Sequence, residues 1–403
     1  MTDKLQKHSD TISARIGQHL HDEEWPRPEV MPIYQTSVFT FTDVDDVVEY
    51  YEQKPPGRYL YSRNGNPNVT AVERAIADLE GAPAASASAS GMGAISSAII
   101  AICKTGDHVL MAREIYGGTL VLLRGVLARY GVTLSLVDAT DLAAVQSALT
   151  DHTALVIAES ISNPLLSVTD IAGLAEVTHQ AGAKLLIDNT FATPLSIQPL
   201  ALGADLVVHS ATKYFGGHSD VSGGVVCGSQ ELIEGVRSVV ATVGANLSPF
   251  DAWLIARSIK TLSLRFRRQC DTALQLAQWL EAEQLVREVF YPGLEQHPHY
   301  SLAKASLNSL FGAIISIRLR DDLATVNRFM RALPSIPFAP SLASVVTTLS
   351  HPWTTSHRGF TEEERLAFGI TPGLIRLSIG TEHVEDLKNE LGIALTACLE
   401  VDN

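Results

Sequence analysis

The sequence is poor in positive charge and has no long apolar segment. Its 30 lysines and arginines are outnumbered by 44 acidic residues, and the formal net charge is −14. Because nucleic-acid binding depends on a basic surface, this balance argues against a nucleic-acid partner. No apolar run reaches the roughly 18 residues that cross a bilayer, and the polar N-terminus lacks the apolar core of a signal peptide. We therefore expect a cytoplasmic protein that binds neither nucleic acid nor membrane.

Cysteine is also scarce, and no two cysteines form a CxxC pair. The four cysteines are widely spaced and mostly stand in apolar surroundings: Cys103, Cys227, Cys270 and Cys398. This spacing fits neither a disulfide framework nor a zinc site, so we expect reduced, packed thiols. His351 and His357 bracket the segment HPWTTSH, but no further ligand has a suitable spacing, and we predict no metal. No glycine-rich nucleotide-binding motif follows an apolar strand.

What the sequence does contain is an alternation of short apolar runs and amphipathic segments up to about residue 240. The apolar runs predict strands at 108–111, 133–137, 154–158, 184–187, 206–209 and 224–227. The amphipathic segments predict helices that include 93–103, 119–130 and 171–181. An earlier helix is expected to begin after Asn66 and to end at Gly81. Such alternation is typical of an α/β fold with a mostly parallel sheet and helices on both of its faces.

The remaining parts of the chain define the predicted domains. Residues 1–64 carry prolines and aromatics but few periodic elements, so this arm is expected to lie across a neighbouring subunit or to wrap its own. The large domain is placed at 65–257. A long helical stretch, 249–280, leads into a smaller C-terminal α/β domain, placed at 258–403, whose strands and helix are predicted at 311–320, 374–379 and 321–333.

One lysine, Lys213, has neighbours in the sequence that suggest a catalytic role. The apolar run 205–209 is followed by Ser210, Thr212 and Lys213, and an amine held among small hydroxyl side chains can lose its proton and attack a carbonyl. The two hydroxyls could bind a phosphate, and Asp188 ends another apolar run. Ligands of parallel sheets collect beyond the carboxyl ends of the strands. These groups would suit pyridoxal 5'-phosphate, whose ring acts as an electron sink when a carboxylate keeps the pyridine nitrogen protonated.

The whole segment 188–220, DNTFATPLSIQPLALGADLVVHSATKYFGGHSD, resembles the pyridoxal-phosphate attachment signature of the Cys/Met metabolism enzymes. This trans-sulfuration family includes cystathionine γ-synthase, the cystathionine lyases and methionine γ-lyase, and the resemblance extends from about residue 32 to the last helix. It implies the fold-type I architecture of the aspartate aminotransferase-like enzymes. It also implies a homotetramer built from active dimers, which acts on a small sulfur amino acid.

The resemblance further implies which residues hold the cofactor phosphate. In the family, a loop that matches Ser90, Gly91 and Met92 binds the phosphate together with the two hydroxyls before the lysine. A Tyr-x-Arg pair from the neighbouring subunit contacts the same phosphate, and Tyr61 and Arg63 match this pair. Without the resemblance, the glycine pair would indicate a turn, and Arg63 would be read as a surface arginine.

Other matches concern the cofactor ring and the substrate. Tyr116 matches the tyrosine that stacks on the pyridine ring and handles a proton, so Lys213, Tyr116 and Asp188 are the implied catalytic residues. Asn163, in the segment ESISNP, matches the asparagine near the phenolic oxygen of the cofactor, where it also borders the substrate. Arg376 and Ser341 match the arginine that binds the substrate carboxylate and the serine beside it; a structural salt bridge is the alternative for Arg376.

The substrate depends on positions at which the chain differs from its relatives. Family members that act on cystathionine have polar residues where this chain has Leu60, Val121 and Val346. Three aliphatic side chains favour an apolar substrate such as methionine or homocysteine. Methionine γ-lyases usually carry a cysteine where this chain has Gly118.

We therefore predict a carbon–sulfur lyase that performs α,γ-elimination to a 2-oxo acid, ammonia and a thiol. Three alternatives stay open: γ-replacement on an O-acylhomoserine, β-elimination as in cystathionine β-lyase, and a non-catalytic α/β module.

Overall fold

The computed structural model describes residues 8–16, 28–53 and 57–399, so parts of the predicted arm lie outside the described residues. The chain divides into two compact units. Unit 1 consists of Met1–Ala101, Val208–Gly216 and Asp220–Ser263, and unit 2 consists of Ile102–Val207, Gly217–Ser219 and Leu264–Asn403. Each unit is therefore built from separate stretches of the chain. The three-part division at residues 64 and 257 stays a prediction.

The strands confirm the predicted α/β class. The larger sheet has seven strands in the order β1-β7-β6-β5-β4-β2-β3. Their bounds are β1 Ala84–Ser88, β2 His108–Ala112, β3 Thr133–Val137, β4 Thr153–Glu159, β5 Lys184–Asp188, β6 Leu206–His209 and β7 Gly224–Gly228. In unit 2, β2 pairs in parallel with both β3 and β4, and β4 with β5. In unit 1, β1 pairs with β7 in the antiparallel direction, and the chain passes between the units within β6.

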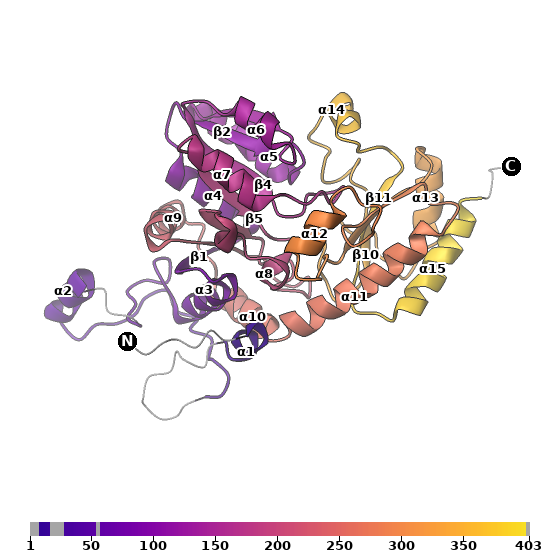
Figure 1. Ribbon diagram of the computed structural model, residues 1–403. Helices are drawn as coiled ribbons and strands as arrows, with labels where there is room; N and C mark the ends of the chain where they lie inside the picture. Colours follow the sequence, from indigo (N-terminus) through magenta and orange to yellow (C-terminus); the bar gives the residue numbers. More distant parts are fainter. Residues whose placement is uncertain (1–7, 17–27, 54–56, 400–403) are drawn as a thin grey trace. The chain divides into compact units, whose positions relative to one another are not determined.

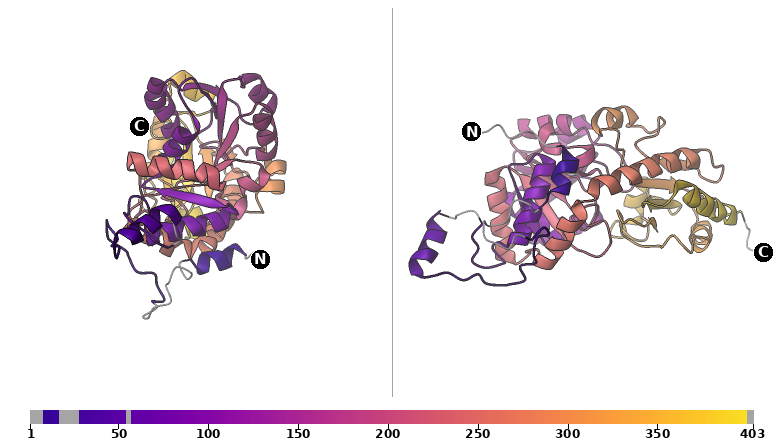
Figure 2. Two further views of the ribbon diagram at one scale, coloured as in Figure 1. Left: turned by 90° about the vertical axis from the view of Figure 1, so that its left-hand side faces the viewer. Right: turned by 90° about the horizontal axis from the view of Figure 1, so that it is seen from below.

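The helices of unit 1 are α1 Ser9–Ala14, α2 Val44–Gln53, α3 Pro67–Glu80, α4 Gly91–Ile102, α9 Gln230–Val243 and α10 Pro249–Ile259, of which α4 ends one residue beyond the unit. Helix α3 packs against β1 and α10. Figures 1 and 2 show α2 standing apart from α3, and α2 has no buried residue. Unit 1 therefore exposes an arm that carries a helix with no core of its own.

Asn66 caps α3 as predicted, and its loss should destabilise the protein. Its side-chain oxygen accepts a hydrogen bond from the Asn68 N–H at 2.9 Å, and its Nδ2 donates to the Tyr34 carbonyl at 2.9 Å. Asn66→Ala is expected to lower the free energy of unfolding by about 2 kcal/mol, because the buried Asn68 N–H loses its acceptor and the Tyr34 carbonyl loses its donor. Urea unfolding measures this change. Asn66→Asp keeps the cap acceptor and should cost less; equal losses in the two variants would contradict the role of the cap.

Unit 2 contains the remaining helices and a four-stranded sheet in the order β10-β11-β9-β8. The strands are β8 Glu288–Phe290, β9 Ile314–Arg318, β10 Thr348–Ser350 and β11 Leu374–Ser378. The helices are α5 Gly117–Val121, η1 Leu122–Val126, η2 Leu127–Tyr130, α6 Leu142–Ala148, α7 Ile171–Gln180, α8 Thr193–Ser196, η3 Pro199–Leu202, α11 Leu262–Glu281, α12 Tyr300–Ser306, α13 Leu323–Arg331, α14 Glu362–Ala367 and α15 Val384–Ala397, of which α11 begins two residues before the unit. Side chains of α11, α13 and α15 form one hydrophobic core with β9 and β11.

Two predicted helices are interrupted. The segment 119–130 was expected to be one helix, but α5 gives way to a π-helical turn, η1, and then to a 3₁₀ turn, η2. The stretch 249–280 is divided between α10 and α11 by a tight turn in which the Thr261 N–H donates to the Ser258 carbonyl at 3.2 Å. Hydrophobic periodicity shows which face of a helix is buried, but it does not show where the hydrogen-bond register changes.

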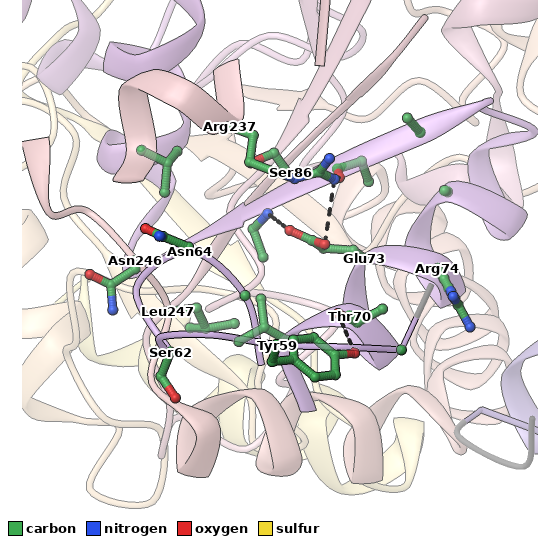
Figure 3. A pocket seen from close by; sticks show the side chains of 18 of the residues that line it. Tyr59, Ser62, Asn64, Thr70, Glu73, Arg74, Ser86, Arg237, Asn246 and Leu247 are labelled. Atoms are coloured by element: carbon green, nitrogen blue, oxygen red, sulfur yellow. Dashed lines mark hydrogen bonds and ion pairs between the residues drawn. The ribbon is translucent and has the colours of Figure 1, made fainter. Parts of the chain in front are cut away.

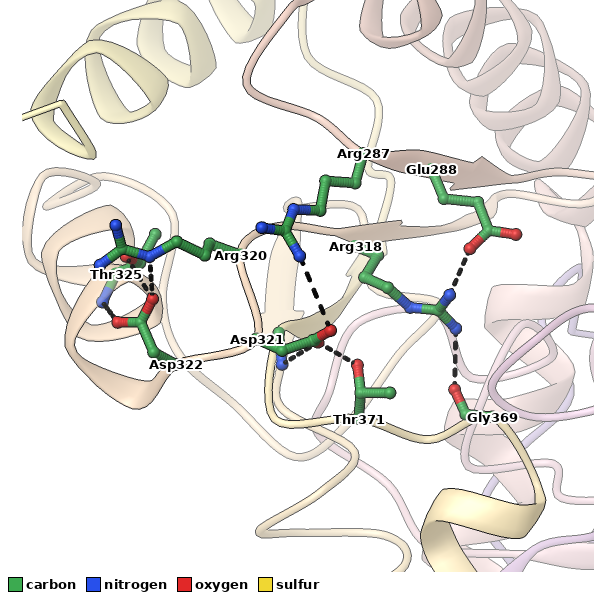
Figure 4. A network of polar contacts seen from close by, with 10 residues as sticks. Arg287, Glu288, Arg318, Arg320, Asp321, Asp322, Thr325, Gly369 and Thr371 are labelled. Carbon is green, nitrogen blue, oxygen red and sulfur yellow. Dashed lines mark hydrogen bonds and ion pairs between the residues drawn. The ribbon is translucent and has the colours of Figure 1, made fainter.

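A polar network fixes the turn that leads into β11 (Figure 4). Arg318 pairs with Glu288 and donates from Nη2 to the Gly369 carbonyl at 2.9 Å. Asp321 accepts hydrogen bonds from the Thr371 hydroxyl and from the Gly373 N–H, the latter at 3.1 Å. The start of β11 is thus held to the end of β9.

Within the described ranges, no helix combines the length and the apolarity needed to cross a membrane.

Candidate functional site

In unit 1, the loop before α4 lies against the turn after β6. A Cβ atom on Gly91 would lie 2.9 Å from Cβ and 3.0 Å from Oγ of Ser210. Only glycine therefore allows the two segments to approach this closely. Ser90 Oγ accepts a hydrogen bond from the Gly93 N–H at 3.0 Å, and Met92 lies in the first turn of α4. The start of α4 and the Ser210 hydroxyl together form an arrangement that favours an anion.

Lys213 lies in the half-buried turn that follows β6. Its N–H donates to the Ser210 carbonyl at 3.0 Å, which fixes the turn. Thr212 Oγ1 accepts a hydrogen bond from the Gly223 N–H at 3.0 Å and lies 3.2 Å from the Gly223 carbonyl oxygen. The hydroxyl could keep the first contact while it turns its proton toward a phosphate. Unit 1 thus brings together the predicted phosphate loop, both hydroxyls and the lysine.

Tyr61 and Arg63 occupy an exposed turn of the arm. The Asn64 N–H donates to the Tyr61 carbonyl at 2.8 Å, and the Arg63 guanidinium lies 5.5 Å from the centre of the Tyr61 ring. The Tyr61 side chain is 41% exposed. The neighbouring Leu60 carbonyl accepts a hydrogen bond from the Phe39 N–H at 3.0 Å. The Tyr-x-Arg pair is therefore displayed on the surface of unit 1.

A polar cavity of about 690 Å³ lies in unit 1 between the arm, α3 and β1. Figure 3 shows Glu73 at its centre, where it accepts a hydrogen bond from the Ala87 N–H at 2.9 Å and lies 3.6 Å from Arg237. Burial raises the pKa of Glu73. Arg63 also lines this cavity. Elsewhere in its lining, the Tyr59 hydroxyl donates to Thr70 Oγ1 at 3.1 Å.

In unit 2, three residues predicted to bind the substrate meet around one guanidinium. Arg376 Nη1 donates to Asn163 Oδ1 at 2.8 Å, and Nη2 donates to the Ser341 carbonyl at 3.3 Å. Arg376, on β11, is 4% exposed, and Asn163, in the loop after β4, is 3% exposed. The Phe191 ring lies beside the guanidinium, with its centre 6.0 Å away. A buried guanidinium is suited to a bidentate pair with an anionic ligand.

Tyr116 is held in unit 2 by a residue to which the sequence analysis gave no role. Its N–H donates to Glu159 Oε1 at 2.9 Å, at the start of α5, while the Tyr116 side chain stays 45% exposed. Glu159, at the end of β4, stands opposite Asp188 in the pairing of β4 with β5. Burial, followed by the charges of Asp188 and Glu114, raises the pKa of Glu159 well above its usual range. An acidic residue at the end of an apolar strand was the available signal.

We expect Glu159→Gln to change how the stability depends on pH. The folded protein binds the Glu159 proton more tightly than the unfolded chain does. The stabilisation is therefore full below the unfolded pKa of about 4.3 and is lost as the pH rises through the folded pKa. Glutamine does not ionise, so it does not lose stabilisation as the pH rises. Its amide oxygen can still accept a hydrogen bond from the Tyr116 N–H. The urea midpoints of both proteins are measured at about pH 5 and about pH 8. The midpoint of the variant, relative to that of the native protein, should be higher at pH 8 than at pH 5. A relative midpoint that is lower at pH 8 would contradict this prediction.

The two predicted specificity residues of unit 2 are exposed. Val121 is 57% exposed at the end of α5, and Val346 is 47% exposed in the loop before β10. A Cβ atom on Gly359 would lie 3.6 Å from Cγ2 of Val121, so the loop before α14 contacts α5 there. Both valines therefore expose apolar groups on the surface of unit 2.

The two histidines of HPWTTSH are buried and bind neighbouring groups. His351 Nδ1 lies 2.9 Å from the Thr354 hydroxyl, and Nε2 lies 2.8 Å from the Pro372 carbonyl oxygen. In the part of the chain that the structure describes, no group of three or more His, Cys, Asp or Glu residues could hold a metal ion. The four cysteines are free thiols.

Comparisons with known proteins identify enzymes that are similar to this chain over most of its length. An L-methionine gamma-lyase of Porphyromonas gingivalis is 42% identical over 363 residues, which cover 89% of this chain and 90% of that protein. An O-succinylhomoserine sulfhydrylase of Pseudomonas aeruginosa is 40% identical over 388 residues, which cover 96% of this chain and 95% of that protein. The residue-by-residue roles remain predictions, since similarity over whole chains does not test them.

The fold is shared with solved enzymes. The crystal structure of cystathionine gamma synthase from Xanthomonas oryzae pv. oryzae, in complex with aminoacrylate and cysteine, matches with a TM-score of 0.91 and 35% identity and covers 97% of this chain and 98% of that one. This similarity confirms the predicted fold class. The family model described as Cys/Met metabolism PLP-dependent enzyme matches residues 10–396. The chain therefore belongs to the Cys/Met metabolism family of pyridoxal-phosphate-dependent enzymes.

Proposed function

We propose that the protein is a carbon–sulfur lyase that performs α,γ-elimination on a methionine, homocysteine or cystathionine type of substrate. The products are a 2-oxo acid, ammonia and a thiol. The observation that carries this proposal is the aliphatic character of Leu60, Val121 and Val346. An apolar pocket leaves a distal ammonium or carboxylate poorly solvated, so it favours methionine over cystathionine.

The residues present fit pyridoxal 5'-phosphate, the cofactor of the family. The close approach of Gly91 to Ser210 leaves the start of α4 beside a hydroxyl, and this is a suitable cradle for a phosphate. When bound, the cofactor supplies an electron sink for a carbanion at the substrate Cα. In this proposal, Ser90, Gly91, Met92 and the residues after β6 would hold the phosphate and the aldehyde carbon. Asp188 would contact the pyridine nitrogen and Asn163 the phenolic oxygen.

The chain's own side chains would then move and hold the protons. Lys213 would be released by the substrate amine and would take the Cα proton. Asp188, whose Oδ1 accepts the Thr190 N–H at 2.9 Å, would hold the proton on the pyridine nitrogen. After Lys213 has moved a Cβ proton, Tyr116 would donate a proton to the leaving γ-sulfur. Arg376 would hold the substrate carboxylate throughout.

The complete site requires a second copy of the chain in this proposal. Tyr61 and Arg63 stand on the exposed arm, and in the resembled family such a pair reaches the phosphate of a neighbouring subunit. We expect an active dimer and a homotetramer made of two such dimers. Sedimentation of the holoenzyme tests this assembly, and a fully active monomer would refute it. Free thiols agree with a cytoplasmic location, which is also part of the proposal.

One observation favours a second function, γ-replacement on an O-acylhomoserine. Gly118 stands where methionine γ-lyases usually carry a cysteine, and one relative is named O-succinylhomoserine sulfhydrylase. Replacement and elimination share their early steps, so the same residues serve both. β-Elimination, as in cystathionine β-lyase, is the third reading.

Product identification distinguishes these reactions. The holoenzyme is incubated separately with L-methionine, L-homocysteine, cystathionine and O-succinylhomoserine, the last with and without sulfide. The elimination proposal expects 2-oxobutanoate and a thiol from L-methionine. Homocysteine formed only when sulfide is present would favour replacement, and pyruvate from cystathionine would favour β-elimination. The proposal fails if no γ-substituted amino acid yields 2-oxobutanoate.

A further inference from the structure

His209 and Glu80 form a buried, hydrogen-bonded pair in unit 1 that has no part in the proposed reaction. His209 is the last residue of β6 and Glu80 is the last residue of α3, 129 positions away in the chain. His209 Nε2 is hydrogen-bonded to Glu80 Oε1, and each residue is 1% exposed. Burying an imidazole and a carboxyl group costs free energy that their mutual bond only partly offsets. The pair therefore calls for an explanation.

The turn that follows β6 closes over the His209 ring. The rings of Phe215 and His209 form a T-shaped pair, with centres 5.0 Å apart and an angle of 74° between their planes. The Gly216 N–H donates to the Ala211 carbonyl at 2.8 Å, which folds this turn back on itself. Phe215 is 2% exposed. The imidazole is thus held by Glu80 at Nε2 and by an aromatic ring beside it, so its orientation is fixed.

The same turn is tied to the two segments beside it. The Thr212 N–H donates to the Gly223 carbonyl at 3.2 Å, so the turn lies against the residue before β7. A Cβ atom on Gly224 would lie 2.2 Å from the Ser90 carbonyl oxygen, so the first residue of β7 in turn touches the loop before α4. The predicted phosphate site is therefore assembled from three closely fitting pieces of backbone. A small shift at the end of β6 would move the Ser210 and Thr212 hydroxyls relative to the start of α4.

We propose that His209 and Glu80 are positioning residues for the cofactor phosphate. Their hydrogen bond fixes the end of β6 to the end of α3, so the turn that begins there presents its two hydroxyls to the phosphate in a constant place. An apolar pair of similar size would fill the same space without fixing the direction in which the chain leaves β6, because dispersion contacts lack the directionality of a hydrogen bond. The inference rests on the proposed phosphate roles of Ser210 and Thr212.

Two ligands that differ only in the phosphate group test the inference. Pyridoxal 5'-phosphate and pyridoxal can both bond to Lys213 in the proposed site, but only the first has a phosphate. Absorbance titration of the full chain, freed of cofactor, gives both dissociation constants, and the ratio of the pyridoxal value to the pyridoxal 5'-phosphate value measures the preference for phosphate. His209→Phe keeps a ring beside Phe215 but removes the bond to Glu80, and we expect it to lower this preference about tenfold. His209→Gln, whose amide nitrogen can take the place of Nε2, should keep most of the preference.

A double variant separates positioning from stability. Glu80→Met combined with His209→Phe replaces the pair with apolar side chains of similar size, an exchange that often leaves a protein equally stable or makes it more stable. We expect a urea midpoint at least equal to that of the native protein, together with the same tenfold loss of preference. A native preference in the double variant overturns the inference, because the pair would then serve folding alone. This variant also decides the question should His209→Phe alone not fold.

Removing the hydroxyls tests the roles on which the inference rests. If Ser210→Ala combined with Thr212→Val leaves the preference for phosphate unchanged, the proposed phosphate contacts are wrong. If these changes lower the preference while His209→Phe and the double variant keep it, the contacts stand and the inference is overturned. A preference as low in His209→Gln as in His209→Phe also overturns it, because a nitrogen at the Nε2 position would then make no difference.

Discussion

Replacing Lys213 with alanine is expected to lower kcat by at least about a thousandfold and to abolish the visible absorbance of the lysine-bound cofactor. The lysine has two tasks in the proposed reaction, since it holds the cofactor and takes the Cα proton. Alanine performs neither. The turn that carries residue 213 is fixed by the main-chain hydrogen bond from the Lys213 N–H to the Ser210 carbonyl at 3.0 Å. Truncating the side chain should therefore leave the backbone unchanged. Absorbance spectra and steady-state rates on the same preparation measure both effects.

Two further variants make this test specific. Lys213→Arg keeps the positive charge but cannot bond to the cofactor aldehyde carbon, so it should be as inactive as the alanine variant. Lys260→Ala changes an exposed lysine at the end of α10 in the same unit and should retain the native rate and spectrum. Native absorbance and native rate in Lys213→Ala would show that another amine holds the cofactor.

Local patterns predicted those parts of the fold that depend on neighbouring residues. Strand β6 has its predicted bounds, Leu206–His209, because a short apolar run before small polar residues signals its own end. Asn66 caps α3 as expected, because a cap is decided within one helical turn. The interruption at η1 was not predicted, since the register of helix hydrogen bonds depends on what the helix packs against.

The sequence predicted the site less completely than the fold, because residues that meet in the site are far apart in the chain. Arg376 and Asn163 are 213 positions apart, and only the resemblance placed both near a substrate. Glu159 is part of a motif in the sequence, but its contact is with a residue far from it in the chain. The Glu159 carboxylate accepts a hydrogen bond from the Tyr116 N–H. A buried polar residue is visible in the sequence, whereas the group that it serves is visible only in three dimensions.

Arg376→Ala is expected to lower kcat/KM by about thirtyfold to a few thousandfold for an amino-acid substrate. Truncating one partner of a buried, hydrogen-bonded charge pair costs about 2–5 kcal/mol, and each 1.4 kcal/mol corresponds to about a factor of ten. Arg376 is 4% exposed, so water does not readily replace its guanidinium. The change should appear mainly in KM if Arg376 binds substrate and transition state equally. Steady-state kinetics with L-methionine measure it.

Two controls distinguish a carboxylate-binding role of Arg376 from a structural salt bridge. Arg320→Ala removes an exposed arginine of unit 2 that pairs with Asp322, and kcat/KM should stay within about twofold because surface ion pairs contribute little. Added guanidinium should partly restore activity to Arg376→Ala, since the space left by the side chain retains the Asn163 and Ser341 oxygens that bound it. A structural arginine would instead show a lowered unfolding midpoint with an unchanged KM in the fraction that remains folded. That result would remove Arg376 from the substrate site.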